Sequence, residues 1–148
     1  MYDLVKSEER APLAETSSKL TKLRRIALIG NFPPRRCGIA TFTSDLRDAI
    51  LSAQPTLLCD VVAMSDPLGD GPYPDAVTRL IRQDVLTDYV DAARAMNDDG
   101  VELACIQHEY GIFGGPAGDH LLTLLKTLTC PVVTTKARTT IKSASCKR

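Results

Sequence analysis

The sequence predicts a three-layer α/β domain of the Rossmann-like type, with a mostly parallel sheet between its helices. Short apolar runs, typical of strands buried on both faces, alternate with longer segments in which apolar residues recur every three or four positions. This alternation predicts βαβ units, and right-handed crossovers between them place helices on both faces of a parallel sheet. The 148 residues leave room for one domain of this kind.

The first half of the domain is expected to contain three strands and one helix. Residues 26–30 (IALIG) form a continuous apolar run that ends at a glycine, as expected for the first strand of a parallel sheet. After a loop rich in turn-forming residues, a helix is predicted from the spacing of Phe42, Leu46, Ala49, Ile50 and Ala53. Residues 57–64 are predicted to form a strand, residues 65–75 a loop rich in Pro and Gly, and residues 77–81 a short strand.

The second half is expected to add two helices and two strands. Asp84 is a candidate N-cap for a helix whose apolar face comprises Leu86, Tyr89, Val90, Ala93 and Met96. Residues 101–106 (VELACI) are predicted to form the next buried strand. Pro116 suits the first turn of a helix that carries Leu121, Leu122, Leu125 and Leu128. Residues 131–135 (PVVTT) are expected to begin the last strand.

Composition and charge narrow the class of protein. Hydrophobic residues make up 44% and charged residues 24%, as in soluble globular proteins, and every apolar run is much shorter than a membrane span. The 18 basic residues equal the 18 acidic ones, so the strongly basic surface typical of nucleic-acid binding is absent. Residues 136–148 hold five basic and no acidic residues, which leaves a net charge of −5 for residues 1–135. We therefore expect a flexible leader over 1–23, a domain over 24–135 and a disordered basic tail over 136–148.

The cysteines and the amino-terminal segment indicate in which cellular compartment the protein is expected. Five widely spaced cysteines without a C-x-x-C pair argue against a disulfide framework and against a zinc site. The first twenty residues contain no apolar run that resembles a signal peptide, so a cytoplasmic protein is expected. The basic run Lys19, Lys22, Arg24 and Arg25 allows peripheral contact with acidic lipid, although a solvated entrance to the first strand is the commoner explanation of such a run.

Function is expected at the carboxyl ends of the strands. In open α/β sheets, ligands bind beyond these ends, where the strand order reverses. For the common order 3-2-1-4-5, the loop after the first strand and the loop after the 101–106 strand are neighbours across that point. Gly38 and His108 should therefore approach one crevice, with Arg35 or Arg36 adding positive potential at its rim.

The first of these loops, NFPPRRCGIAT, matches neither a dinucleotide-binding nor a P-loop glycine pattern. Gly38 nevertheless precedes a predicted helix, so its backbone can approach an anion that the helix dipole, Arg35 and Arg36 would attract. The alternative is an ordinary tight turn with two solvated arginines. Cys37, beside Arg36 and near the helix start, is a candidate for a lowered thiol pKa or is simply a small loop residue.

The second loop, QHEYGIFGG, combines an imidazole, a carboxylate and three glycines at the end of a strand. His108 can hold a substrate hydroxyl or transfer a proton near neutral pH, and the glycines allow a ligand close to the backbone. The alternative is a histidine that is hydrogen-bonded only to backbone. His120 lies within a predicted helix, where a capping or surface role is expected.

Three segments carry a family resemblance: PPRRCGIATFTSDL (33–46), QHEYGIFGGPAGDHLLTLL (107–125) and PVVTT (131–135). They resemble the amino-terminal domain of bacterial retaining glycosyltransferases of family 4, the GT-B group once called group 1. The resemblance covers residues 25–135 and implies two facing Rossmann-like domains, of which the amino-terminal one binds mainly the sugar or glycan acceptor.

The same resemblance implies roles for individual residues. Arg35, Arg36 and Gly38 would lie in the loop near the diphosphate of the nucleotide-sugar donor, and His108 would be the active-site histidine. The acceptor loop would comprise Glu109, Tyr110, Gly114 and Gly115. Hexose transfer from the nucleotide-sugar co-substrate would proceed with retention, without a bound metal or other cofactor.

Two departures from the family pattern stand beside this resemblance. PVVTT is normally followed by a segment of the type LHTVL, whereas here it meets KARTT, and no paired-glutamate donor domain follows. The expectation is therefore the acceptor-side half of a glycosyltransferase from a truncated or frame-shifted gene, inactive alone. The alternative is a non-enzymatic Rossmann-like module that binds a glycan, a nucleotide or a protein.

Overall fold

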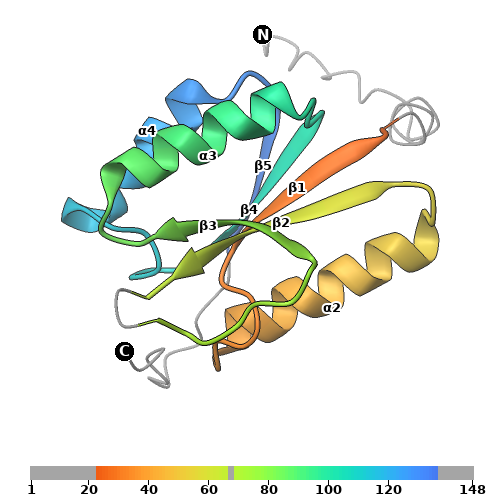
Figure 1. The fold of residues 1–148 in the computed structure, drawn as a ribbon, viewed down its shortest axis with the longest axis horizontal. Helices are drawn as coiled ribbons and strands as arrows, with labels where there is room; N and C mark the ends of the chain where they lie inside the picture. Colours follow the sequence, from red (N-terminus) through yellow and green to blue (C-terminus); the bar gives the residue numbers. More distant parts are fainter. Residues whose placement is uncertain (1–22, 67–68, 137–148) are drawn as a thin grey trace, which may run out of the picture.

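The computed structural model describes residues 23–66 and 69–136, and these form a three-layer α/β fold around a five-stranded parallel sheet (Figure 1). The strands lie in the order β3-β2-β1-β4-β5, and every pair of neighbours is parallel. The predicted fold class is confirmed. The elements, in chain order, are β1 (Arg25–Gly30), α2 (Gly38–Ala53), β2 (Leu58–Ser65), β3 (Val77–Arg82), α3 (Leu86–Asp98), β4 (Leu103–His108), the 3-10 helix η1 (Pro116–Gly118), α4 (His120–Thr127) and β5 (Val132–Lys136).

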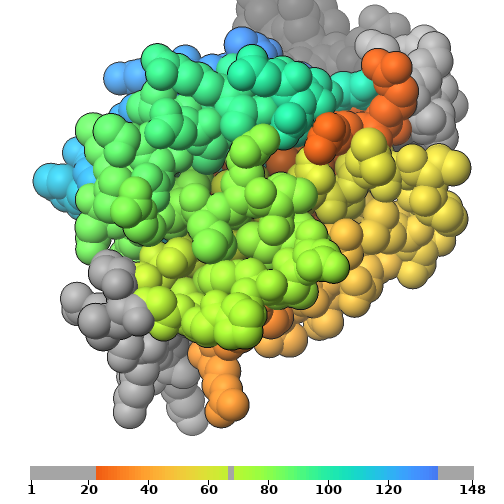
Figure 2. Space-filling view, in the orientation of Figure 1, coloured from red at the N-terminus to blue at the C-terminus, as the bar shows by residue number. Residues whose placement is uncertain are grey.

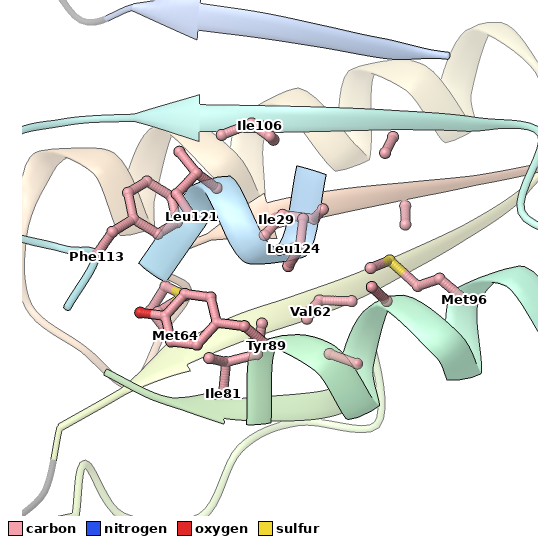
Figure 3. Packing of buried hydrophobic residues seen from close by; sticks show 14 of the residues in the cluster. Ile29, Val62, Met64, Ile81, Tyr89, Met96, Ile106, Phe113, Leu121 and Leu124 are labelled. Atoms are coloured by element: carbon pink, nitrogen blue, oxygen red, sulfur yellow. The ribbon is translucent and has the colours of Figure 1, made fainter. Parts of the chain in front are cut away.

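The helices cover the two faces of the sheet unequally. Helix α2 lies against β1 and β2 on one face, whereas α3 and α4 pack together on the other (Figure 1). The larger core lies on the α3 and α4 side, where Ile29, Val62 and Ile106 of the central strands meet Tyr89 and Leu124 of the helices (Figure 3). A smaller cluster beneath α2 contains Ile26, Leu28, Leu57 and Cys59.

Strand β1 lies at the centre of the sheet between β2 and β4. Ala27, Leu28 and Ile29 have no exposed surface, because consecutive side chains of a strand point to opposite faces and both faces are covered here. This explains why β1 is a continuous apolar run rather than an alternating one.

Several sequence predictions differ from the structure in detail. β4 begins at Leu103 rather than Val101, because the N–H of Val101 donates to the carbonyl of Met96 and still completes the end of α3. It continues through His108, which pairs with Lys136 of β5. On the helices, Phe42 (44% exposed), Leu86 (45% exposed) and Leu122 (54% exposed) were expected on the apolar faces but point outward.

Two helix starts were also predicted wrongly. Val85, not Asp84, is the N-cap of α3, and it makes no side-chain capping bond. Pro116 begins the short helix η1 instead of α4, since Ala117 adopts the left-handed conformation (φ 53°) and interrupts the helix before His120. Of the expected leader and basic tail, residues 1–22 and 137–148 lie outside the described residues.

Candidate functional site

A cavity of about 700 Å³ opens at the carboxyl edge of the sheet, beside the point where the loops that follow β1 and β4 diverge. The chain leaves β1 toward α2 on one face and leaves β4 toward α4 on the other, which is the arrangement that creates a crevice in open α/β sheets. Three segments line the cavity: Asn31 and Arg35 after β1, Gln83 and Asp84 after β3, and a stretch of 108–118 after β4. The two loops predicted to face one crevice therefore do so.

His108 is the last residue of β4 and lines this cavity half-buried. Its ring lies edge-on to Tyr110, with ring centroids 6.0 Å apart, and tilted against Phe113 at 5.7 Å. Among the described residues, no hydrogen bond fixes the imidazole, so the alternative of a purely backbone-bonded histidine finds no support there. The strand end and two aromatic rings orient it, and its nitrogens can bond a ligand hydroxyl.

Glu109 and Tyr110 continue the same wall of the cavity. Glu109 is half-buried, while the Tyr110 side chain is 81% exposed. The ammonium of Lys136, at the end of β5, lies 5.9 Å from the centroid of the Tyr110 ring. An exposed aromatic ring beside a histidine and a carboxylate offers both an apolar contact surface and hydrogen-bonding groups to one ligand.

The loop after β4 is fixed to its neighbours by a buried tyrosine. The Tyr89 hydroxyl donates to the carbonyl of Gln83 at 2.7 Å and accepts from the N–H of Gly114 at 2.9 Å. The side-chain amide of Gln83 donates to the carbonyl of Gly111 at 2.7 Å. Burial raises the pKa of Tyr89, so the hydroxyl stays protonated and able to donate.

Gly114 and Gly115 allow this close packing. A Cβ at Gly114 would collide with the backbone of Gln83, and a Cβ at Gly115 with the side chains of Asp119 and His120. Gly115 also has a positive φ of 80°, which side chains rarely tolerate. The two glycines are therefore needed to shape the wall of the cavity, in addition to allowing a ligand near the backbone.

Arg35 lines the cavity but is not free to add positive potential there, contrary to the expectation from sequence. Its guanidinium forms an ion pair with Asp66 at 3.3 Å and a longer one with Asp70 at 3.9 Å, and it donates to the Asn31 amide oxygen at 3.1 Å. Its side chain is 11% exposed. Asp66 and Asp70 belong to the loop between β2 and β3, which packs over the segment that follows β1 (Figure 2).

Gly38 and Arg36 are not among the residues that line the cavity. Gly38 is the first residue of α2, and a Cβ there would meet no atom within 4 Å. Cys37 is the N-cap and provides no side-chain capping bond, and the first turn of α2 carries no acidic residue. Arg36 is exposed. The start of α2 therefore has the exposed backbone and the helix dipole that were expected. It lies, however, outside the cavity that His108 lines.

Two buried polar groups were missed by the sequence reasoning. His120 is half-buried at the start of α4 instead of on the surface, with its ring edge-on to Tyr89 at 5.5 Å. Its Nδ1 is buried without a hydrogen-bond partner among the described residues, as are both amide atoms of Gln107, whose side chain is 1% exposed. No spacing signal marks either, because both depend on tertiary packing.

Outside the cavity, the described residues offer few other candidate functional groups. No group of three or more His, Cys, Asp or Glu side chains within them is placed to hold a metal ion. Burial raises the pKa of the Cys59 thiol to about 11, which makes it a core residue and not a nucleophile. No helix in the same part of the chain is both long and apolar enough to cross a membrane.

Comparison of the chain with protein-family models, with curated proteins and with solved structures finds no match. The case for function therefore depends on the geometry of the cavity and on the motifs of the two loops that form it.

Proposed function

We propose that the described domain is the acceptor-binding part of a retaining glycosyltransferase that transfers a hexose from a nucleotide-sugar to a sugar or glycan. The observation that carries the proposal is the cavity between the loops after β1 and β4, with His108 in its wall. The resemblance of residues 33–46, 107–125 and 131–135 to family 4 enzymes supports it, because two of these motifs form that cavity.

The chemistry of the cavity suits a hydroxyl-rich ligand. An imidazole nitrogen of His108 accepts or donates a hydrogen bond, and the Glu109 carboxylate accepts from sugar hydroxyls. The donor site and its paired glutamates belong, in this proposal, to a second domain that residues 24–135 do not include. Transfer needs both halves held together, because positioning of the reactants and stabilisation of the departing diphosphate are shared between them.

A non-enzymatic glycan-binding module is the second candidate. It is favoured by the ion pairs of Arg35 and by the position of Gly38 and Arg36 outside the cavity, since both weaken the expected donor-phosphate loop. The two candidates share the sugar site and differ in whether the bound sugar becomes an acceptor.

The sugar site is tested by NMR titration of the labelled chain with a panel of neutral mono- and disaccharides. We expect shifts concentrated in residues 108–118, and about a tenfold weaker affinity for His108→Ala, because a ligand hydrogen bond is lost. Arg94→Ala, exposed on α3, is the matched control and should bind like the wild type. A panel without a binder, or binding unaffected by His108→Ala, contradicts the proposal.

Donor binding and transfer by the chain alone test whether the donor site belongs to a different domain. Nucleotide-sugar binding should be no tighter than about millimolar, and no transfer should occur without a donor domain. Micromolar donor affinity by calorimetry, or turnover by the isolated chain, would show that the donor site is not elsewhere. The non-enzymatic module would be favoured if sugar binds but no added family donor domain restores transfer.

A further inference from the structure

We propose that Asp66 and Asp70 set the ligand selectivity of the cavity: they cancel the charge of Arg35, so the site takes an uncharged sugar ring against Tyr110 and rejects phosphorylated ligands. This inference depends on the proposed function, because it names the class of ligand for the same site. Its evidence is the polar network behind the cavity wall.

Within the described residues, Arg35 is the only arginine or lysine that lines the cavity, beside the imidazole of His108. Such a residue would ordinarily attract phosphate, because the guanidinium fork matches its oxygens. Here the fork is already engaged, with Nη2 on Asp66 at 3.3 Å, Nη1 on Asn31 at 3.1 Å and Nε facing Asp70 at 3.9 Å. A phosphate would have to displace these partners.

Two hydrogen bonds hold the Asp70 carboxylate in place. The hydroxyl of Tyr73 donates to Asp70 at 2.7 Å, and the N–H of Asp66 donates to the same carboxylate at 3.0 Å. The side chains of Asp66, Asp70 and Arg35 are each only 11–12% exposed, so solvent screens their interaction weakly. Burial and the Asp70 carboxylate raise the pKa of Tyr73, which keeps the hydroxyl as a donor.

The rest of the lining adds negative charge. Asp84 and Glu109 both border the cavity, and neither has an ion-pair partner among the described residues. With Arg35 neutralised, these two carboxylates repel an anion. Lys136 is exposed and its ammonium lies 5.9 Å from the centroid of the Tyr110 ring, but it does not line the cavity.

Tyr110 provides the surface for an uncharged ring. Its side chain is 81% exposed although it borders the cavity, so a large apolar area stays in water in the absence of a ligand. The C–H face of a sugar ring can cover that area while its hydroxyls reach His108 and Glu109. One ring thus satisfies both the apolar and the polar parts of the wall.

The proposed rejection of phosphate is tested with inorganic phosphate as the probe. Its binding is followed by NMR titration of the wild type, Asp70→Asn and the double variant Arg35→Gln/Asp70→Asn. Asparagine keeps an oxygen for Tyr73 and removes the charge. The wild type should bind phosphate only weakly, Asp70→Asn should bind it about tenfold more tightly than the wild type, and the double variant should lose this gain. If Asp70→Asn does not fold, as judged by its thermal melt, Asp66→Asn replaces it.

The proposed packing of a sugar ring on Tyr110 is tested with the neutral saccharide that binds best in the panel. Tyr110→Ala should weaken its affinity about tenfold, whereas Phe42→Ala, an exposed aromatic outside the cavity, should not. Phosphate binding to the wild type as tight as to Asp70→Asn overturns the charge selectivity and leaves the sugar site standing. The absence of any neutral binder overturns the proposed function itself, whatever the phosphate result.

Discussion

Gly114 illustrates how much of the site depends on the size of single residues. Its N–H donates to the buried Tyr89 hydroxyl, and its Cα lies so close to the carbonyl of Gln83 that no Cβ fits. From sequence, this glycine indicates only backbone freedom. The ion pairs of Arg35 are equally invisible in the sequence, because Asp66 and Asp70 lie 31 and 35 residues away in a loop whose path is set by packing.

Gly114→Ala should therefore destabilise the domain by about 2 kcal/mol or more, because the loop must move away from Gln83 and the Tyr89 hydroxyl loses a partner. Urea unfolding followed by circular dichroism measures the loss. Gly38→Ala is the control, since a Cβ there has open space, and it should leave stability unchanged or raise it by up to about 1 kcal/mol. Equal effects of the two variants would contradict the packing described for Gly114.

At the scale of elements, the strands were predicted better than the helix ends. Buried parallel strands have a distinctive apolar run, and 26–30 and 57–64 match β1 and β2 to within one or two residues. Helix starts depend on which polar group reaches which backbone atom. Asp84 was a reasonable N-cap by residue type, but Asp88 holds the chain entering α3 instead, by accepting bonds from the backbone and side chain of Arg82.

Asp88 should give the domain a stability that depends on pH. Its hydrogen bonds from Arg82 hold its pKa below the ordinary 3.8, so its contribution is present above pH 4 and is lost as pH falls through the folded-state value. Because Arg82 is largely exposed, we expect Asp88→Asn to cost only about 1 kcal/mol at pH 7. Urea unfolding at pH 7 and pH 3 should show the difference from wild type shrinking at the lower pH.

Asp91→Asn is the matched control on the same helix, because Asp91 is exposed and has no ion pair among the described residues. It should change stability by less than about 0.5 kcal/mol at both pH values. A difference between Asp88→Asn and wild type that stays constant from pH 7 to pH 3 would mean that the Arg82 contacts do not depend on the carboxylate charge.

For the whole molecule, the strand order explains both the site and the distribution of stability. With β1 and β4 adjacent at the centre, their loops must leave the same edge of the sheet toward opposite faces, and a crevice follows. This much could be predicted from alternating strands and helices. The charge inside the crevice could not, because it depends on side chains that meet only after folding.

The same order predicts a gradient of stability from β1 to β5. Leu28 is fully buried in the cluster beneath α2, whereas Val133 on the edge strand β5 is 53% exposed. Leu28→Ala leaves a cavity that the surrounding strands and α2 cannot fill, so it should cost about 2–5 kcal/mol. Val133→Ala removes apolar surface that is already half in water and should cost less than about 1 kcal/mol. Chemical unfolding of both variants against wild type checks this, and a loss at Val133 as large as at Leu28 would mean that the edge of the sheet is covered, in solution, by something that packs on β5.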